Sequence, residues 1–243
     1  MKSDLRGRYE LKFLVTPEGR DEILNRMGDA LVPDSNGDNG IYAIRSLYYD
    51  TKCQKAYYEK LDGLARRHKF RLRYYGKEAP QTGFFEIKSR YDRLISKVRI
   101  PLSTSEFESI LASPDALLEL DPPKTESLRL GLEFIRRTHL AEALIPSVVT
   151  SYTREAYFCS YDPTVRVTLD HSCEGLNPGR FPQKATESGL PLCHRDHMIL
   201  ELKFNHRLPS WMRDAVMSTN LRAVRFSKYA EAVEELDSQG ASR

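Results

Sequence analysis

The chain has 243 residues, of which 40% are hydrophobic, so it can bury a sizeable core and a disordered chain is excluded. Lys and Arg number 37 against 34 Asp and Glu, a formal charge of +3, and this near-balance argues against a general nucleic-acid coat. The sequence contains no run of about 18 apolar residues that could span a membrane, and its first residues lack the apolar stretch of a signal peptide. We therefore expect a cytoplasmic chain without a membrane span, with four cysteines present as free thiols.

The predicted elements are mostly strands. In chain order, the strand candidates are 7–15, 43–49, 68–75, 83–90, 94–100, 148–158, 164–170 and 197–204. Helix signals lie between them: Thr16 can cap a helix that starts at Pro17, further helices are expected near 104–112 and 124–143, Pro209 opens another, and Ser227 can cap a last one to about 237. Breaker-rich stretches at 33–40, 76–83, 121–123 and 174–191 indicate loops within one domain.

Consecutive strands without regular helical crossovers predict an antiparallel sheet in an α+β fold. Eight strands suffice to close a barrel, and the expected fold is an eight-stranded antiparallel β-barrel tunnel with flanking helices. A sandwich is the alternative from the pattern alone. We expect residues 1–243 to form a single domain, with a core of about 7–232.

Charged residues alternate with apolar residues along most of these strands. Strand side chains point to opposite faces with a period of two, so Arg8, Glu10 and Lys12 share one face of the first strand. One half-solvated strand would show this pattern without any ligand. The repetition across the set carries the argument: the later strands place on one face Lys69, Arg71 and Arg73; Glu86 and Lys88; Lys97 and Arg99; Arg154; Arg166 and Asp170; and Glu201 and Lys203.

Like charges repel across a sheet, so a face rich in Arg and Lys is easier to explain if a polyanion lies against it. Arginine suits forked contacts with phosphate oxygens, and a sheet closed with this face inward would direct the cations into one channel. The carboxylates on the face have two open interpretations: they neutralise neighbouring lysines, or one or two hold Mg²⁺ or Mn²⁺. Glu201 is the first candidate ligand, and Glu10 and Glu86 are the others.

The C-terminal segment gives a separate indication of anion binding. Arg225 and Lys228 flank Ser227, where the last helix is expected to begin. Positive side chains beside the positive end of a helix dipole are unfavourable unless an anion is bound there. A phosphate site and two solvated side chains are both compatible with this pattern.

Cys173, Cys193, His194 and His197 lie in one segment and have side chains that can ligate zinc. They lack the paired C-x₂-C spacing of structural zinc sites, so an ordinary loop is the preferred prediction.

Several short motifs occur in a fixed order from about residue 7 to 232. They are Arg8-x-Glu10-x-Lys12, Ser46-Leu47-Tyr48-Tyr49-Asp50-Thr51, Lys69-Phe70-Arg71-Leu72-Arg73, Phe85-Glu86-Ile87-Lys88, Lys97-x-Arg99, Tyr152-x-Arg154, Arg166-Val167-Thr168-x-Asp170, Leu200-Glu201-Leu202-Lys203 and Phe226-Ser227-Lys228-Tyr229. This ordered set resembles the VTC domain, the catalytic domain of the vacuolar transporter chaperone complex and a polyphosphate polymerase. That family is grouped with the CYTH proteins among the triphosphate tunnel metalloenzymes.

The resemblance implies a basic tunnel with Glu201 as metal ligand. The positions that match the family's phosphate-binding residues are Lys12, Arg71, Arg73, Lys88, Lys97, Arg154, Arg166, Arg225 and Lys228, and the charged face and helix start add Arg8, Arg99, Lys203 and Ser227. Eukaryotic members of the family also carry an SPX domain and membrane helices. The sequence here shows neither, so we expect a bacterial protein, and whether it has a membrane protein as partner is an open question.

The expected function is a Mn²⁺- or Mg²⁺-dependent polyphosphate polymerase that uses ATP and inorganic polyphosphate, not nucleic acid. Catalysis would consist of positioning and charge stabilisation. A tripolyphosphatase or nucleoside triphosphatase in the same tunnel is one alternative, and a polyphosphate-binding module without catalysis is another.

Overall fold

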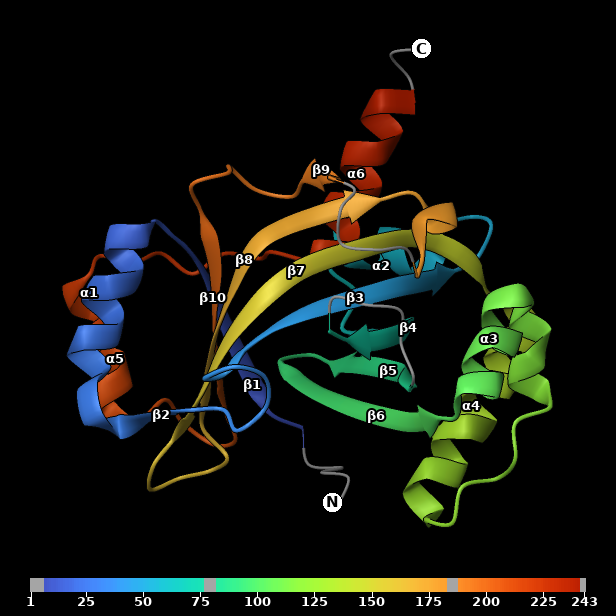
Figure 1. Cartoon of the computed structure of the whole chain (residues 1–243), viewed down its shortest axis with the longest axis horizontal. Helices are drawn as coiled ribbons and strands as arrows, with labels where there is room; N and C mark the ends of the chain where they lie inside the picture. Colours follow the sequence, from blue (N-terminus) through green and yellow to red (C-terminus); the bar gives the residue numbers. More distant parts are fainter. Residues whose placement is uncertain (1–6, 77–81, 183–187, 241–243) are drawn as a thin grey trace.

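The computed structural model describes residues 7–76, 82–182 and 188–240. Its ten described strands form one antiparallel sheet, in which the eight long strands follow the order β1-β10-β8-β7-β3-β4-β5-β6 (Figure 1). The strands are β1 (Tyr9–Val15), β2 (Leu31–Pro33), β3 (Ile41–Asp50), β4 (Arg66–Tyr75), β5 (Gly83–Tyr91), β6 (Leu94–Leu102), β7 (Ile145–Cys159), β8 (Arg166–Leu176), β9 (Leu190–Pro191) and β10 (Met198–Phe204). All eight predicted strands are present: seven match their expected bounds to within three residues, and β8 runs six residues past the expected end at 170.

The first and last strands of this order, β1 and β6, approach each other beside the start of β1. The backbone nitrogen of Arg8 is 2.9 Å from the carbonyl oxygen of Ile95, and the nitrogen of Ile95 is 3.0 Å from the oxygen of Arg8. Within the described residues this bridge replaces a full ladder, so the barrel seam is closed at one point. The antiparallel tunnel is therefore confirmed, with an incomplete seam and two short extra strands: β2 pairs with β7, and β9 pairs with β8.

The helices are α1 (Pro17–Met27), α2 (Lys55–Leu61), α3 (Thr104–Ala112), α4 (Glu126–Glu142), α5 (Ser210–Ser218) and α6 (Lys228–Gly240), with 3₁₀ turns η1 (Gly28–Ala30), η2 (Pro114–Leu118) and η3 (Pro178–Arg180). Two predicted caps are confirmed: the hydroxyl oxygen of Thr16 accepts a hydrogen bond from Gly19 N, and that of Ser227 accepts one from Ala230 N. The predicted loops at 76–83 and 174–191 lie partly outside the described residues, and the described part of 174–191 is not all loop, because it contains the end of β8, η3 and β9.

Helix α2 has no counterpart among the predicted elements, because its cap comes from the preceding strand. Asp50, at the end of β3, accepts hydrogen bonds from the backbone nitrogens of Ala56 and Tyr57 at 2.9 and 3.2 Å. Gln54, directly before the helix, has a φ of 53° and makes no side-chain cap. The usual signal of Ser, Thr, Asp or Asn directly before the helix is therefore missing.

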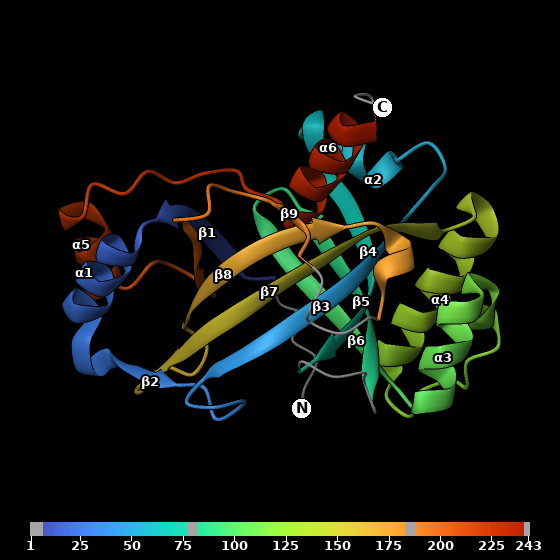
Figure 2. The ribbon, with the colours of Figure 1, turned by 45° about the horizontal axis from the view of Figure 1, so that its top comes forward.

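The helices cover the outer faces of the sheet and one end of the barrel. Helices α1 and α5 pack beside β1, β10 and β8, where Phe13, Ile23 and Leu200 are buried in one apolar cluster. Helices α3 and α4 pack on β5 and β6 at the opposite side (Figure 1), around Phe85, Ile110 and Ile135. Helices α2 and α6 lie together beside β4, β7 and β8 (Figure 2). Because the apolar strand faces point to these helices, the charged faces point into the barrel.

Candidate functional site in the barrel interior

The sheet register brings the predicted charged residues together in rows across neighbouring strands. Lys12 on β1 lies opposite Glu201 on β10, and Arg154 on β7 lies opposite Asp170 on β8. On the other half of the barrel, Glu86 on β5 lies between Arg71 on β4 and Arg99 on β6. The positions that alternation assigned to one face are therefore adjacent inside the barrel, as predicted.

Glu86 is the centre of one ionic cluster. Its carboxylate oxygens lie 2.6 Å from Arg71 Nη2, 2.6 Å from Arg99 Nε, 3.5 Å from Arg73 Nη1 and 3.7 Å from Lys97 Nζ. We call these five residues the Glu86 cluster. The Glu86 side chain is 0% exposed, and burial favours its neutral form, but the surrounding cations outweigh burial and hold its pKa well below the usual value.

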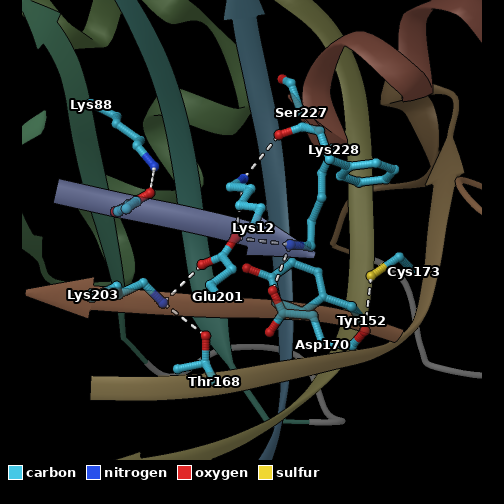
Figure 3. A network of polar contacts seen from close by, with 12 residues as sticks. Lys12, Lys88, Tyr152, Thr168, Asp170, Cys173, Glu201, Lys203, Ser227 and Lys228 are labelled. Atoms are coloured by element: carbon cyan, nitrogen blue, oxygen red, sulfur yellow. Dashed lines mark hydrogen bonds and ion pairs between the residues drawn. The ribbon is translucent and has the colours of Figure 1, made fainter. Parts of the chain in front are cut away.

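Glu201 and Asp170 form a second cluster, shown in Figure 3. The carboxylate oxygens of Glu201 lie 2.8 Å from Lys203 Nζ, 3.1 Å from Lys12 Nζ, 3.5 Å from Lys228 Nζ and 3.6 Å from Arg154 Nη2. Asp170 accepts two hydrogen bonds from Arg154, at 2.7 and 2.8 Å, and one from Lys228 at 2.5 Å. We call these six residues the Glu201 cluster. Despite burial, its cations lower the pKa of Asp170 to about 2 and that of Glu201 well below its usual value, so both are ionised at neutral pH.

Glu10 on β1 lies near the Glu201 cluster and pairs with a lysine on β5. Its carboxylate lies 2.7 Å from Lys88 Nζ on β5 and 3.7 Å from Arg8. Burial raises its pKa, but the Lys88 ammonium and further lysines outweigh burial and lower the value to about 2. Neutralisation of neighbouring lysines, one of the two interpretations of the carboxylates, is therefore present in the structure.

Burial and neighbouring cations lower the pKa values of several interior lysines. Burial is the largest effect on Lys203 and, with nearby Arg154, lowers its pKa to about 7. Burial and neighbouring cations also hold the pKa values of Lys69 and Lys97 well below normal. Lys69 lies directly opposite Lys88, which lies opposite Lys97. This row of like charges is the arrangement expected of a surface that an anion completes.

Arg166 lies at the start of β8 and is held by a residue that the sequence patterns did not indicate. Its Nη2 is 2.6 Å from the carboxylate of Asp34, which is buried in the segment after β2. The guanidinium of Arg166 lies 4.1 Å from the centre of the Phe158 ring. Asp34 therefore positions Arg166 at the end of the barrel where β8 begins.

At the start of α6, the expected phosphate position, protein carboxylates already neutralise one of the two cations. Lys228 opens the helix, but its charge is matched by Asp170 and Glu201. Ser227 accepts a hydrogen bond from Lys69 Nζ at 2.6 Å, so this residue faces the interior. Arg225 is exposed, and its charge contributes to lowering the pKa of Arg67, the second residue of β4. The dipole argument therefore fails for Lys228, because a carboxylate distant in sequence already neutralises it.

Aromatic residues also line the interior, which alternation of charges alone did not reveal. Tyr9, Phe13 and Phe85, which alternate with the charged residues along their strands, pack in the outer apolar clusters. The rings of four other tyrosines, however, lie among the interior cations: Tyr42, Tyr48, Tyr75 and Tyr152. The period-two pattern of β3, with Tyr42, Ser46 and Tyr48 on one face, contains this signal.

The carboxylates offer oxygen donors for Mg²⁺ or Mn²⁺ without forming a complete cage. No group of three or more His, Cys, Asp or Glu side chains within the described residues is arranged to hold a metal. Glu201 and Glu10 are close enough to affect each other's ionisation. One or two carboxylates completed by phosphate oxygens and water is the usual environment of Mg²⁺, and Glu201 with Glu10 fits that description. Glu86 fits it less well, because its side chain is fully buried and three of its four cation partners are arginines, whereas three of the four partners of Glu201 are lysines.

Cys173, Cys193, His194 and His197 line a cavity of about 150 Å³ beside β9. Among the described residues they are not arranged as a metal site. The four cysteines of the chain are free thiols, as predicted. Cys193 Sγ instead contacts the carbonyl oxygen of His197 at 3.5 Å.

Comparison with known proteins identifies the family. A family model described as the VTC domain matches residues 7–237. The chain belongs to the VTC domain family. It is 24% identical, over 231 residues, to vacuolar transporter chaperone complex subunit 4 of Trypanosoma brucei brucei, and the match covers 79% of this chain and 28% of that protein. The VTC domain described here thus corresponds to about a quarter of this curated relative.

Two solved structures share the fold. HpAC1 from Hippeastrum, studied as an adenylyl cyclase and found to have a dominant triphosphatase activity, superimposes with a TM-score of 0.57 at 14% identity, covering 94% of this chain and 96% of that one. A protein from Bacillus halodurans assigned as an adenylate cyclase superimposes with a TM-score of 0.56 at 15% identity, covering 91% and 94%. None of the described helices of this VTC domain combines the length and apolarity needed to cross a membrane.

Proposed function

We propose that this VTC domain is a polyphosphate polymerase, which transfers the γ-phosphate of ATP to a growing polyphosphate chain inside the barrel. The observation that supports the proposal is the interior itself: two ionic clusters in which cations outnumber ionised carboxylates, enclosed by an antiparallel barrel. Such an interior is incomplete without a polyanion, and a linear phosphate chain fits an enclosed path.

The cations would bind and position the phosphates. Arg71 and Arg99 present guanidinium groups that suit phosphate oxygens, and both are fixed by Glu86 and by tyrosine hydroxyls: Arg71 by Tyr48 at 3.0 Å and Arg99 by Tyr75 at 2.6 Å. The side chains of Lys12, Lys88 and Lys203 are 18%, 29% and 5% exposed, and each ends in an ammonium group that can contact phosphate oxygens. Alignment of the terminal chain oxygen with the γ-phosphorus requires no side-chain nucleophile, so positioning and charge stabilisation suffice.

Glu201 and Glu10 are the residues that would hold Mg²⁺ or Mn²⁺. Both are ionised, and both must exchange a lysine partner for the metal. A bound metal would supply further neutralisation of phosphate oxygens and polarise the transferred group. Lys12 and Lys203, released from Glu201, would then be available to phosphate.

Product analysis tests the proposal. Purified protein incubated with ATP and Mn²⁺ should yield ADP and long phosphate chains, which gel electrophoresis resolves. ADP with free phosphate alone would favour the second candidate, a triphosphatase, which the activity described for HpAC1 brings into consideration.

A variant of Glu201 separates catalysis from binding. We expect Glu201→Gln to lower turnover about a hundredfold while tripolyphosphate binding is kept or strengthened, since one negative charge is removed beside Lys12 and Lys203. Glu142→Gln is the matched control, because Glu142 pairs with Lys55 on the outside of the barrel. Tight polyphosphate binding by the unaltered protein without metal-dependent turnover would instead indicate a binding module.

A further inference from the structure

One end of the barrel is lined by aromatic rings. Tyr42 is the second residue of β3, Tyr75 the last of β4 and Phe84 the second of β5, so all three lie where these strands meet the same end. The rings of Tyr42 and Tyr75 are 5.8 Å apart, and those of Tyr75 and Phe84 are 6.1 Å apart, both edge to face. All three residues are partly exposed. We call this group the aromatic end.

Arginine planes lie beside these rings. The guanidinium of Arg99 is 5.5 Å from the centre of Tyr75 and 4.8 Å from that of Phe84. Arg154, directly opposite Tyr42 in the sheet, and Arg166 both act on the ionisation of Tyr42. Aromatic faces and guanidinium planes are the two side-chain surfaces on which nucleobases stack.

The opposite ends of the same strands have different chemistry. There Arg67 on β4 lies opposite Arg90 on β5, followed by the pair Lys69 and Lys88. Lys69 also contacts Ser227, at the start of α6. Repeated point charges suit a phosphate chain, which has no ring to stack.

We propose that the aromatic end binds the nucleoside of ATP, with the base stacked on Tyr42, Tyr75 or Phe84. This inference rests on the proposed function, and it assigns the nucleotide to one end of the barrel and the exit of the polyphosphate chain to the other. The triphosphate then passes Arg99 into the Glu86 and Glu201 clusters, and the polyphosphate chain leaves toward Lys69 and Ser227. Arg99 connects the two parts, because it contacts both the rings and Glu86.

Affinities for ATP and for inorganic tripolyphosphate, measured by calorimetry at fixed ionic strength, test the inference, because tripolyphosphate lacks the nucleoside. We expect the double variant Tyr42→Leu, Phe84→Leu to lower the affinity for ATP about tenfold more than that for tripolyphosphate, from the loss of stacking. Tyr42→Phe, which keeps the ring, should retain the ratio of the unaltered protein. Tyr9→Leu is the control, since Tyr9 stacks on Phe204 at the outer face.

Photocrosslinking of the unaltered protein with 8-azido-ATP gives a second test that needs no variant. We expect labelled peptides that contain Tyr42, Tyr75 or Phe84. Labelling confined to peptides around Lys69 and Arg90, or equal losses of both affinities in the double variant, would overturn the direction proposed here. Chain synthesis by the unaltered protein would still stand in that case, whereas failure to make any product from ATP would refute the proposed function itself.

Discussion

The Glu86 and Glu201 clusters use the same kinds of residue in different proportions. Glu86 is a lone carboxylate in contact with four cations of the described chain, and it is completely buried. Glu201 shares its cations with Asp170, so Arg154 and Lys228 each contact two carboxylates. Loss of one carboxylate therefore has different consequences in the two clusters.

This difference assigns different tasks to the two halves of the barrel. Around Glu86, three arginines are held in fixed orientations, as expected of a surface that grips phosphate oxygens. Around Glu201, the partners are mostly lysines, whose pairings can exchange when a metal or phosphate arrives. Under the proposed function, the first half would orient the phosphates, and the second would rearrange around them.

The largest effect is expected from Glu86→Gln. This variant leaves Arg71 and Arg73 buried without their counterion, and loss of one partner of a buried ionic group costs about 3–5 kcal/mol. We expect the free energy of unfolding, measured with urea, to fall by that amount.

Glu201→Gln provides the comparison within the same barrel. Asp170 still pairs with Arg154 and Lys228 in this variant, so the loss of stability should be clearly smaller than for Glu86→Gln. Equal losses in the two variants would contradict the distinction between the clusters.

The sequence predicted the strands and the charged face well, because both depend on local periodicity. Alternation placed Arg71, Glu86 and Arg99 on inward faces, and the register then made them neighbours. The pairing of Lys228 with Asp170 joins residues 58 positions apart, and no local pattern indicates it. The same holds for Asp34 with Arg166, which are 132 positions apart. Asp50 caps α2 from six residues away, outside the position directly before the helix where a cap is usually sought.

The interior tyrosines were missed for a different reason. Tyr48 and Tyr152 have the apolar appearance of core residues, yet their hydroxyls accept hydrogen bonds from Arg71 and Arg73. The pattern of charges alone assigns both tyrosines to the apolar core. Their amphipathic character places them where apolar and ionic parts of the interior meet.

An effect of about tenfold per pH unit is expected on the affinity for ATP. In the free protein the pKa of Lys203 is about 7, because of burial and nearby Arg154, so this lysine is largely neutral at pH 8. A bound phosphate favours the charged form and raises this pKa. Binding therefore takes up a proton above pH 7, and ATP affinity should fall by up to about tenfold for each unit between pH 7.5 and 9. Calorimetry in two buffers of different ionisation enthalpy measures the uptake.

Lys203→Arg tests the assignment, because arginine stays charged over this range. We expect the proton uptake to decrease but not to vanish, since burial and neighbouring cations also lower the pKa values of Lys69 and Lys97. An unchanged uptake would show that the proton binds elsewhere.

The smallest effect is expected from Lys69→Met, at the end of the barrel opposite the aromatic rings. The Lys69 ammonium contacts Ser227 Oγ and the face of the Tyr229 ring, and it faces the like charge of Lys88. Its removal relieves repulsion, so the stability of the free protein should rise slightly. If the chain passes this end, affinity for long polyphosphate should fall about threefold, the value of one weakened charge contact, while ATP affinity changes less.

The control is Lys55→Met, which removes a lysine that pairs with Glu142 on the outer surface. Equal weakening of both ligands would place the nucleotide phosphates, and not the chain, beside Lys69.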